Sequence, residues 1–307
     1  MKKIRVGIIG YGNLGKSIEQ IVANDDSFKL VAVFSKRLVK SNYTVTDFPS
    51  NIGKYKNKID VMFLCGGSSS NLMEQAKEAL NYFCCIDAFD THKNIPIHLK
   101  NCDTLAKENK KVAFCSFGWD PGLFSLMRVL FTSLGNPTYT AWGKGVSQGH
   151  SEAIRCIKGV KDAIQYTVPN IKIIEQLKSG KLQKLDNDKN LHLRECYIVA
   201  DPENRPSIIK KVIEMPNYFL GYQTKIRFID EYKMQKHKNL FHAGEVFTVG
   251  NEMNFKLSLK SNPDFTAKVL VAYSKVLFKY YLSEQYGAYT ILDIPFSHLL
   301  KNSEKLI

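Results

Sequence analysis

The chain has 307 residues, of which 44% are hydrophobic and 11% aromatic, and it carries a formal charge of +14. This composition indicates a globular protein of about two domains, and because no apolar run reaches about eighteen residues we expect no membrane partner and a cytoplasmic location. The positive charge favours anionic ligands, but the lysines are dispersed and no nucleic-acid-binding motif occurs, so we expect no nucleic-acid partner.

Residues 1–117 alternate short apolar segments, rich in β-branched and aromatic side chains, with helical patterns. Such alternation is typical of a parallel sheet with crossover helices. The predicted strands are residues 4–9, 30–34, 61–64, 83–87 and 112–117, and the predicted helices are residues 14–23, 72–79 and 97–108.

A glycine motif joins the first predicted strand to the first predicted helix, because residues 10–15 read G-Y-G-N-L-G. The first glycine of such a motif permits a tight turn, the second lets backbone N–H groups approach a pyrophosphate, and the third allows the helix to pack on the strand. The helix N-terminus then attracts the anion. The motif predicts an α/β fold that begins with a Rossmann dinucleotide-binding domain. Its predicted cofactor contacts are Gly10, Tyr11, Gly12, Asn13, Leu14 and Gly15.

The end of the second predicted strand indicates which dinucleotide binds. An NAD-specific domain has an acidic residue there to accept from the ribose 2′-hydroxyl, but this strand ends in Ser35, Lys36 and Arg37. A hydroxyl and two cations suit a 2′-phosphate, which an acid would repel. The alternative is an ordinary polar strand end. We therefore expect NADP as the cofactor, bound in part by these three residues.

The segment from Gly118 to Gly122 reads G-W-D-P-G and ends the alternating pattern. Proline followed by glycine favours a sharp reversal of the chain, so we place a domain boundary there. Beyond it, alternating runs predict an α+β domain with a mixed sheet. We expect strands at residues 195–200 and 224–230, helices at 151–163, 171–178 and 207–214, and a final helix around 266–281. The predicted domains are residues 1–118, residues 119–262, and residues 263–307 packing back on the first domain.

The seven cysteines predict reduced side chains. Their number is odd, no C-x-x-C pattern occurs, and most of them lie in apolar runs such as residues 83–86. Zinc sites need clustered soft ligands, which this spacing does not provide. We therefore expect neither a disulfide nor a metal site.

Several motifs together resemble the meso-diaminopimelate dehydrogenase family. They are G-W-D-P-G at 118–122, W-G-x-G-x-S-Q-G-H-S at 142–151 and N-P-D-F-T at 262–266, in addition to the two cofactor motifs. The resemblance covers nearly the whole chain. It implies a homodimeric enzyme that catalyses reversible, NADP-dependent oxidative deamination at the D-centre of meso-2,6-diaminopimelate, giving L-2-amino-6-oxopimelate and ammonia. The reverse reaction would serve lysine and diaminopimelate biosynthesis, and the second domain would bind substrate and form the dimer.

The resemblance implies that Asp90 and Asp120 lie near the reacting amino group. Their positions after the fourth and fifth predicted strands fit this role independently, because ligands bind at the carboxyl edge of such a sheet. The amino group must lose a proton and the iminium must be attacked by water, and carboxylates can relay these protons. Read alone, Asp90 is also a candidate helix N-cap and Asp120 a candidate turn residue.

The resemblance also assigns the substrate's two carboxylates. Gln148 and Gly149 would bind the carboxylate of the reacting centre, with Trp142 as an apolar wall. Thr167, Arg194 and His242 would surround the distal carboxylate, and Asn262 would lie near the distal amino group. A guanidinium can grip a carboxylate through two parallel hydrogen bonds, so Arg194 is chemically the most suitable of these.

The nicotinamide side of the cofactor would contact residues that follow the third, fourth and fifth predicted strands, although a glycine-rich loop can also be a simple turn. The predicted nicotinamide-side contacts are Cys65, Gly66, Gly67, Ser68, Ala88, Phe89, Asp90, Phe117, Gly118, Trp119, Asp120 and Pro121.

The stretch between His242 and Asn262 is shorter than expected for the family.

Two other functions remain open at the level of sequence. The Rossmann half alone fixes no substrate, so the chain could be an NADP-dependent dehydrogenase or reductase of another amino or oxo acid. A non-catalytic protein that senses NADP or binds nucleic acid is the more distant alternative, based on the positive charge.

Overall fold

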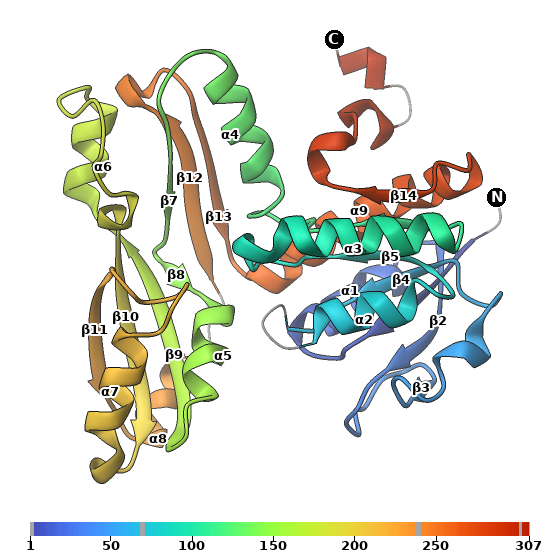
Figure 1. The fold of residues 1–307 in the computed structure, drawn as a ribbon, viewed down its shortest axis with the longest axis horizontal. Coiled ribbons are helices and arrows are strands. Elements are labelled where there is room, and N and C mark those ends of the chain that lie inside the picture. Colours follow the sequence, from blue (N-terminus) through green and yellow to red (C-terminus); the bar gives the residue numbers. More distant parts are fainter. Residues whose placement is uncertain (1–2, 68–70, 238–240, 301–302, 307) are drawn as a thin grey trace. The chain divides into compact units, whose positions relative to one another are not determined.

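The computed structural model of the chain describes residues 3–67, 71–237, 241–300 and 303–306. It divides the chain into two compact units, one formed by Met1–Leu126 with Pro263–Ile307 and the other by Met127–Asn262. The C-terminal segment therefore belongs to the same unit as the N-terminal residues. Figure 1 follows the chain through both units.

The first unit is built on a seven-stranded sheet with the order β14-β6-β5-β4-β1-β2-β3. Every neighbouring pair is parallel. This is the strand order of a Rossmann fold, extended at one edge by a strand from the C-terminal segment. The strands are β1 (Ile4–Ile9), β2 (Phe28–Phe34), β3 (Val45–Thr46), β4 (Val61–Leu64), β5 (Cys84–Asp87), β6 (Val112–Phe114) and β14 (Gly287–Tyr289).

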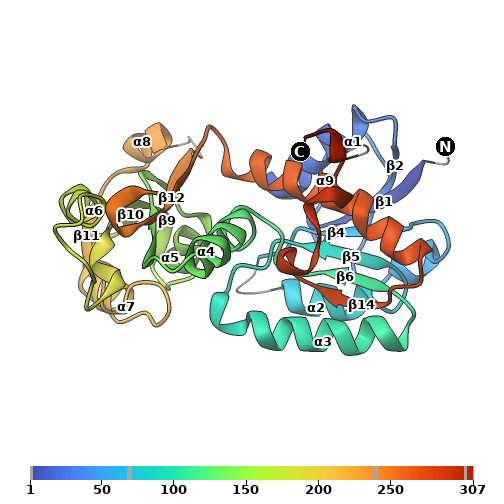
Figure 2. The same cartoon turned by 90° about the horizontal axis from the view of Figure 1, so that it is seen from above.

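Helices cover both faces of this sheet, as Figure 2 shows from above. On one face α1 (Asn13–Ala23) and α9 (Asn262–Leu282) pack against alternate strand residues, and on the other face α2 (Leu72–Ala79) and α3 (Ile95–Glu108) do so. Because successive side chains of a strand point to opposite faces, strands buried on both sides read as continuous apolar runs. The β4 strand, with four buried residues in succession, follows this rule.

The second unit contains two sheets. A mixed four-stranded sheet has the order β11-β10-β9-β8, and a three-stranded antiparallel sheet has the order β13-β12-β7. Helices α5 (Gln148–Arg155) and α7 (Arg205–Ile213) pack on the larger sheet, and α6 (Ile171–Lys178) packs on the smaller one. The strands are β7 (Thr138–Trp142), β8 (Gly145–Val146), β9 (Val160–Pro169), β10 (His192–Ala200), β11 (Gln223–Phe228), β12 (His242–Thr248) and β13 (Asn254–Leu259).

The structure confirms the predicted fold class and corrects several element boundaries. The predicted helix at 151–163 is wrong beyond Arg155, because the chain turns at Gly159, where φ is +95°, and then enters β9. The predicted strand at 112–117 is wrong after Phe114, because Ser116 has a positive φ and takes the chain out of the ladder. Strands β3, β7, β8, β9, β12, β13 and β14 were not predicted.

Neither a membrane span nor a disulfide is found in the part of the chain that the structure describes. None of its helices combines the length and apolar character needed to cross a bilayer. All seven cysteines are free, and five of them are buried.

Candidate active site

The glycine loop of the first unit joins β1 to α1 and leaves the helix N-terminus available to an anion. Gly10 has a φ of +92°, and a side chain there would lie 2.9 Å from the carbonyl oxygen of Cys65. Gly12 is the N-cap of α1, which no described side chain caps, and the first turn contains no acidic residue. The backbone N–H groups at this end therefore keep their capacity to bind a phosphate.

The other two glycines of the motif have different surroundings. No atom lies within 4 Å of the position that a Cβ would take at Gly12. A Cβ at Gly15, in contrast, would overlap the carbonyl oxygen of Gly10. Gly12 thus faces open space that a pyrophosphate can occupy, whereas Gly15 allows the helix to pack closely on the loop.

Ser35, Lys36 and Arg37 follow β2 directly, at the same edge of the sheet as the glycine loop. The backbone N–H of Gly10 donates to the carbonyl of Phe34 at 2.9 Å, which holds the two segments together. Lys36 and Arg37 are exposed, and neither forms an ion pair with a residue that the structure describes. Two unpaired cations beside the glycine loop suit the 2′-phosphate of NADP.

Asp90 and Asp120 follow two neighbouring strands of the sheet. Strands β5 and β6 pair in parallel, so the segments that leave their carboxyl ends emerge at the same edge. Asp90 is exposed and Asp120 is half-buried. Between β6 and Asp120, the Trp119 ring packs edge-on against Phe124 with ring centroids 5.1 Å apart. The topology therefore places both carboxylates at the edge where Rossmann domains bind ligands.

The glycine-rich segment after β4 lies at this edge too. Cys65 and Gly66 are partly buried and Gly67 is exposed, and the backbone N–H of Gly66 donates to Oε1 of Gln75 at 3.1 Å. Ser68, which was also predicted to contact the cofactor, lies outside the described residues.

In the second unit, a buried arginine lies on one face of the four-stranded sheet. The side chain of Arg194 is 6% exposed, and its Nη1 donates to Oγ1 of Thr167 at 2.6 Å. Its guanidinium lies over the ring of Tyr222, 4.1 Å from the centroid. Its Nε has no hydrogen-bond partner, and no carboxylate of the described residues forms an ion pair with it. A buried cation in this state is able to bind an anion.

His192, two residues before Arg194 on β10, presents a second buried donor. Its Nε2 accepts the backbone N–H of Trp142 at 2.8 Å, and the two rings are 4.8 Å apart. A neutral imidazole that accepts through Nε2 carries its proton on Nδ1. This Nδ1 is buried without a partner.

Burial and Arg194 keep the neighbouring histidines neutral. Burial, followed by the charges of Arg194 and His242, lowers the pKa of His192 to about 3 and holds the pKa of His150 well below its usual value. Burial also lowers the pKa of Arg194 itself, although the charge interaction and hydrogen bond with the Tyr222 side chain partly oppose this shift. Arg194 therefore supplies the positive charge of this region.

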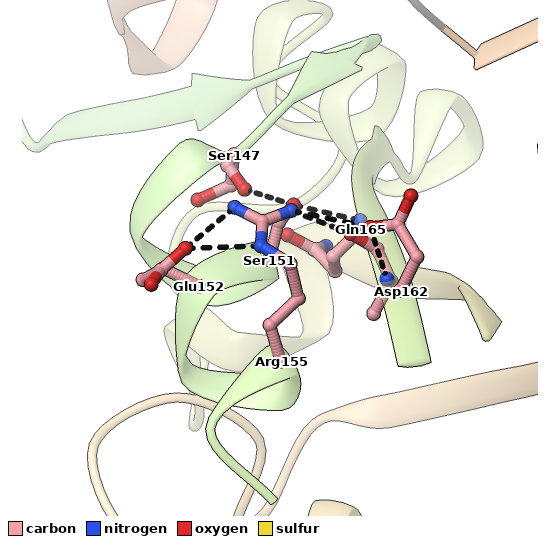
Figure 3. Close-up of polar contacts among 7 residues, drawn as sticks. Ser147, Ser151, Glu152, Arg155, Asp162 and Gln165 are labelled. Carbon is pink, nitrogen blue, oxygen red and sulfur yellow. Dashed lines mark hydrogen bonds and ion pairs between the residues drawn. The ribbon is translucent and has the colours of Figure 1, made fainter. Parts of the chain in front are cut away.

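The N-terminus of α5 brings Gln148 and Gly149 to the same sheet face. The backbone N–H of Ser147 donates to the carbonyl of Gln165 on β9 at 3.0 Å, and Oγ of Ser151 accepts the backbone N–H of Gln165 at 2.9 Å (Figure 3). These bonds fix the first turn of the helix against β9. Gln165 lies two residues before Thr167 on β9, so the two side chains point to the same face of the sheet.

His242 joins this group through the smaller sheet. Gly145 packs so closely on it that a Cβ at Gly145 would overlap its Cα, and Gly145 also pairs with Thr167 across β8 and β9. The β12–β13 hairpin then pairs His242 with Leu259, three residues before Asn262. The short connection noted in the sequence is thus a tight hairpin that returns the chain toward His242.

Sequence reasoning missed three polar residues of this face: His150, Gln165 and His192. A strand period of two would have found two of them, since Gln165 precedes Thr167 and His192 precedes Arg194 by two residues. His150 was part of the quoted motif without a role. Its Nδ1 hydrogen-bonds to Oγ of Ser147.

Comparisons with known proteins identify relatives of this chain. A family model described as "Diaminopimelic acid dehydrogenase C-terminal domain" matches residues 118–261. The chain is 43% identical to a meso-diaminopimelate D-dehydrogenase of Ureibacillus thermosphaericus, over 99% of this chain and 97% of that protein. Among solved structures, a DAP dehydrogenase of C. glutamicum in complex with DAP is 36% identical, with a TM-score of 0.95 over 100% of this chain and 98% of that one. An engineered D-amino acid dehydrogenase bound to NADP+ is 35% identical, with a TM-score of 0.93 over 99% of this chain and 98% of that one.

The surroundings of Gly12 and Gly15 predict different effects of substitution by alanine. Gly12→Ala should fold normally and bind NADP+ roughly tenfold more weakly, because its methyl group occupies the space of the pyrophosphate. Gly15→Ala should lower the free energy of unfolding by about 1–3 kcal/mol, because its methyl group overlaps the Gly10 carbonyl. Titration calorimetry and urea unfolding of both variants measure these effects, and a Gly12→Ala variant with unchanged affinity contradicts the assignment of the loop.

The cations after β2 should decide the choice between dinucleotides. Lys36→Ala combined with Arg37→Ala removes the charges that suit a 2′-phosphate, so Kd for NADPH should rise at least roughly tenfold while Kd for NADH changes little. Lys29→Ala, an exposed lysine near the start of β2, is the matched control. An equal loss of affinity for both dinucleotides would show that these residues do not discriminate between them.

Proposed function

This chain belongs to the meso-diaminopimelate D-dehydrogenase family, and from that premise we propose the reaction and the roles of its residues. The reaction is the reversible, NADP-dependent oxidative deamination of the D-centre of meso-2,6-diaminopimelate. It converts the substrate and water into L-2-amino-6-oxopimelate and ammonia. NADP, when bound, supplies the hydride acceptor, and the glycine loop with Lys36 and Arg37 would hold it.

The observation that carries the substrate proposal is the buried guanidinium of Arg194 without an acidic partner among the described residues. A monocarboxylic amino acid has its single carboxylate at the reacting centre and needs no second anion site. Diaminopimelate has a second carboxylate at its far end. A carboxylate there can accept from Arg194 and complete its hydrogen bonds, which favours the dicarboxylate over simpler amino acids.

The remaining residues of the second unit would bind the two ends of the substrate. Thr167 and His242 would complete the site of the distal carboxylate around Arg194, and Asn262 would bind the distal amino group. Gln148 and Gly149 would bind the carboxylate of the reacting centre, since the first turn of α5 offers both a side-chain amide and backbone N–H groups. The family resemblance supports each of these roles, and Trp142 would supply the apolar wall.

Asp90 and Asp120 would carry the proton chemistry. The substrate's ammonium must lose a proton before its nitrogen lone pair can assist departure of the α-hydrogen as hydride. The resulting iminium carbon must then be attacked by water, which gives up protons as the carbonyl forms and ammonia leaves. A carboxylate can accept these protons and can also stabilise the positive iminium nitrogen. The predicted contacts of residues 65–68, 88–90 and 117–121 with the nicotinamide belong to the same proposal.

The cellular setting of the reaction is also part of this proposal. We expect a homodimer that acts in the cytoplasm, in the direction of lysine and diaminopimelate biosynthesis. The seven free cysteines support a reducing compartment.

A second candidate substrate class is the simpler D-amino acids. The engineered dehydrogenase with a TM-score of 0.93 is named for D-amino acids, so a protein of this fold can act on them. The two candidates differ in whether a distal carboxylate contributes to binding.

Removing the guanidinium tests the substrate proposal. Arg194→Ala should raise KM for meso-diaminopimelate by roughly tenfold to a hundredfold, because a charge-assisted hydrogen bond contributes ~1.5–3 kcal/mol. KM for D-alanine, which has no distal carboxylate, should change far less. Arg227→Ala, an exposed arginine on β11 of the same sheet, is the control. Equal losses on both substrates would contradict the assignment of Arg194 to the distal end.

A further inference from the structure

A buried carboxylate in the first unit connects the two segments that carry Asp90 and Asp120. The side chain of Asp87, the last residue of β5, is 2% exposed. Its Oδ1 accepts the backbone N–H of Phe89 at 2.9 Å and the backbone N–H of Ser116 at 2.8 Å. One oxygen atom therefore holds the chain just before Asp90 and just after β6.

The backbone of Asp87 reinforces the same connection. Its carbonyl oxygen accepts the backbone N–H of Phe117 at 2.8 Å, so β5 is bonded to two consecutive residues of the segment that leads to Asp120. Ser116 has a φ of +65°, which is uncommon for a residue other than glycine. Such a conformation persists only where its surroundings fix it, and the two bonds from Asp87 do so.

The other oxygen of Asp87 contacts a buried histidine. Nε2 of His98, on α3, lies 2.8 Å from Oδ2 of Asp87, and the imidazole is 1% exposed. Phe89 covers the imidazole, with ring centroids 4.6 Å apart. The titratable groups that face His98 are Asp87 from β5, Cys102 from α3 and Cys115, which directly follows β6.

Hydrogen bonding keeps this histidine charged although it is buried. Burial alone would lower its pKa, but the hydrogen bonds and charge interactions with Asp87 and Cys102 exceed that effect and raise the pKa of His98 to about 10. Asp87 and His98 therefore form an ion pair at neutral pH. A buried carboxylate without such a partner would be an uncompensated charge in the interior, which is costly.

We propose that Asp87 and His98 are positioning residues, which hold the segments 88–90 and 115–120 in the geometry that the reaction requires. This inference rests on the proposed roles of Asp90 and Asp120. Neither residue of the pair touches the reacting atoms. Asp87 fixes two backbone segments through their N–H groups, and His98 holds the Asp87 carboxylate in place.

The pair should act over a defined pH range. Because the pKa of His98 in the folded chain, about 10, exceeds the ordinary value of 6.5, its stabilising contribution is fully present below pH 6.5. The contribution is lost as the pH rises through about 10. We therefore expect the two segments to become less ordered near pH 10, before the chain unfolds.

Two substitutions at His98 distinguish a positioning role from a merely structural role. His98→Gln keeps an N–H donor toward Asp87 but does not titrate, whereas His98→Leu removes the donor. The glutamine variant should retain kcat within about threefold, and the leucine variant should lose at least roughly tenfold in kcat, because small misplacements of catalytic groups are costly. Wild type should lose activity near pH 10, and the glutamine variant should not show this loss. The substrate's own amino groups titrate equally in both assays, so the difference between the two pH profiles reports on His98. His92→Leu, at an exposed histidine before α3, is the control.

Amide hydrogen exchange of the ligand-free protein tests the pair without relying on activity. Peptides that cover 88–90 and 115–120 should exchange faster in His98→Leu than in wild type or His98→Gln, with other peptides of the first unit unchanged. If wild type forms no NADPH from diaminopimelate but the exchange result holds, the proposed function fails, whereas the role of Asp87 and His98 in ordering the two segments stands. The inference is overturned if both variants keep wild-type exchange in these peptides, or if His98→Gln keeps the wild-type activity loss near pH 10. If His98→Leu does not fold, the pH profile of His98→Gln still decides.

Discussion

The buried guanidinium of Arg194 is the group around which the second unit's polar face is arranged. Removing a cation from water is costly unless acceptors or an anion compensate. Thr167 supplies one acceptor and Tyr222 an aromatic face, while Nε stays without a partner. The adjacent His150 and His192 are held neutral and provide no negative charge. A carboxylate would complete the hydrogen bonds of Arg194, and the distal carboxylate of the proposed substrate is such a group.

In the first unit, the geometry follows from the parallel sheet. All strands point the same way, so segments distant in the sequence emerge at one edge, including the glycine loop after β1, the cations after β2 and the two aspartates after β5 and β6. This arrangement needs no direct contact between the functional side chains. It does need fixed backbones where the strands end, and the Asp87 carboxylate provides that for two of them.

Local sequence patterns were sufficient for most of the Rossmann half of the fold, although the edge strands β3 and β14 were not predicted. Strand β4 and helix α2 were predicted to the residue, because an uninterrupted apolar run and a period near 3.6 are properties of the segment itself. The start of β9 at Val160 could not be predicted in this way, since its residues become a strand by pairing with β10, about forty residues later. The contact of Asp87 with His98 is likewise invisible in the sequence, because it joins a strand end to a helix. His192 carried a readable signal, its spacing from Arg194, that was not used.

In the proposed reaction, this chain oxidises the D-centre of a substrate whose far end has an L-configured amino acid group. The most direct measurement follows NADPH formation by absorbance with the purified chain, NADP+ and, separately, the meso, LL and DD isomers of diaminopimelate at alkaline pH, kept below the range in which His98 titrates. We expect rapid NADPH formation with the meso isomer and little or none with the other two. Comparable rates with the LL isomer, or no activity with any isomer while D-alanine is oxidised, would contradict it.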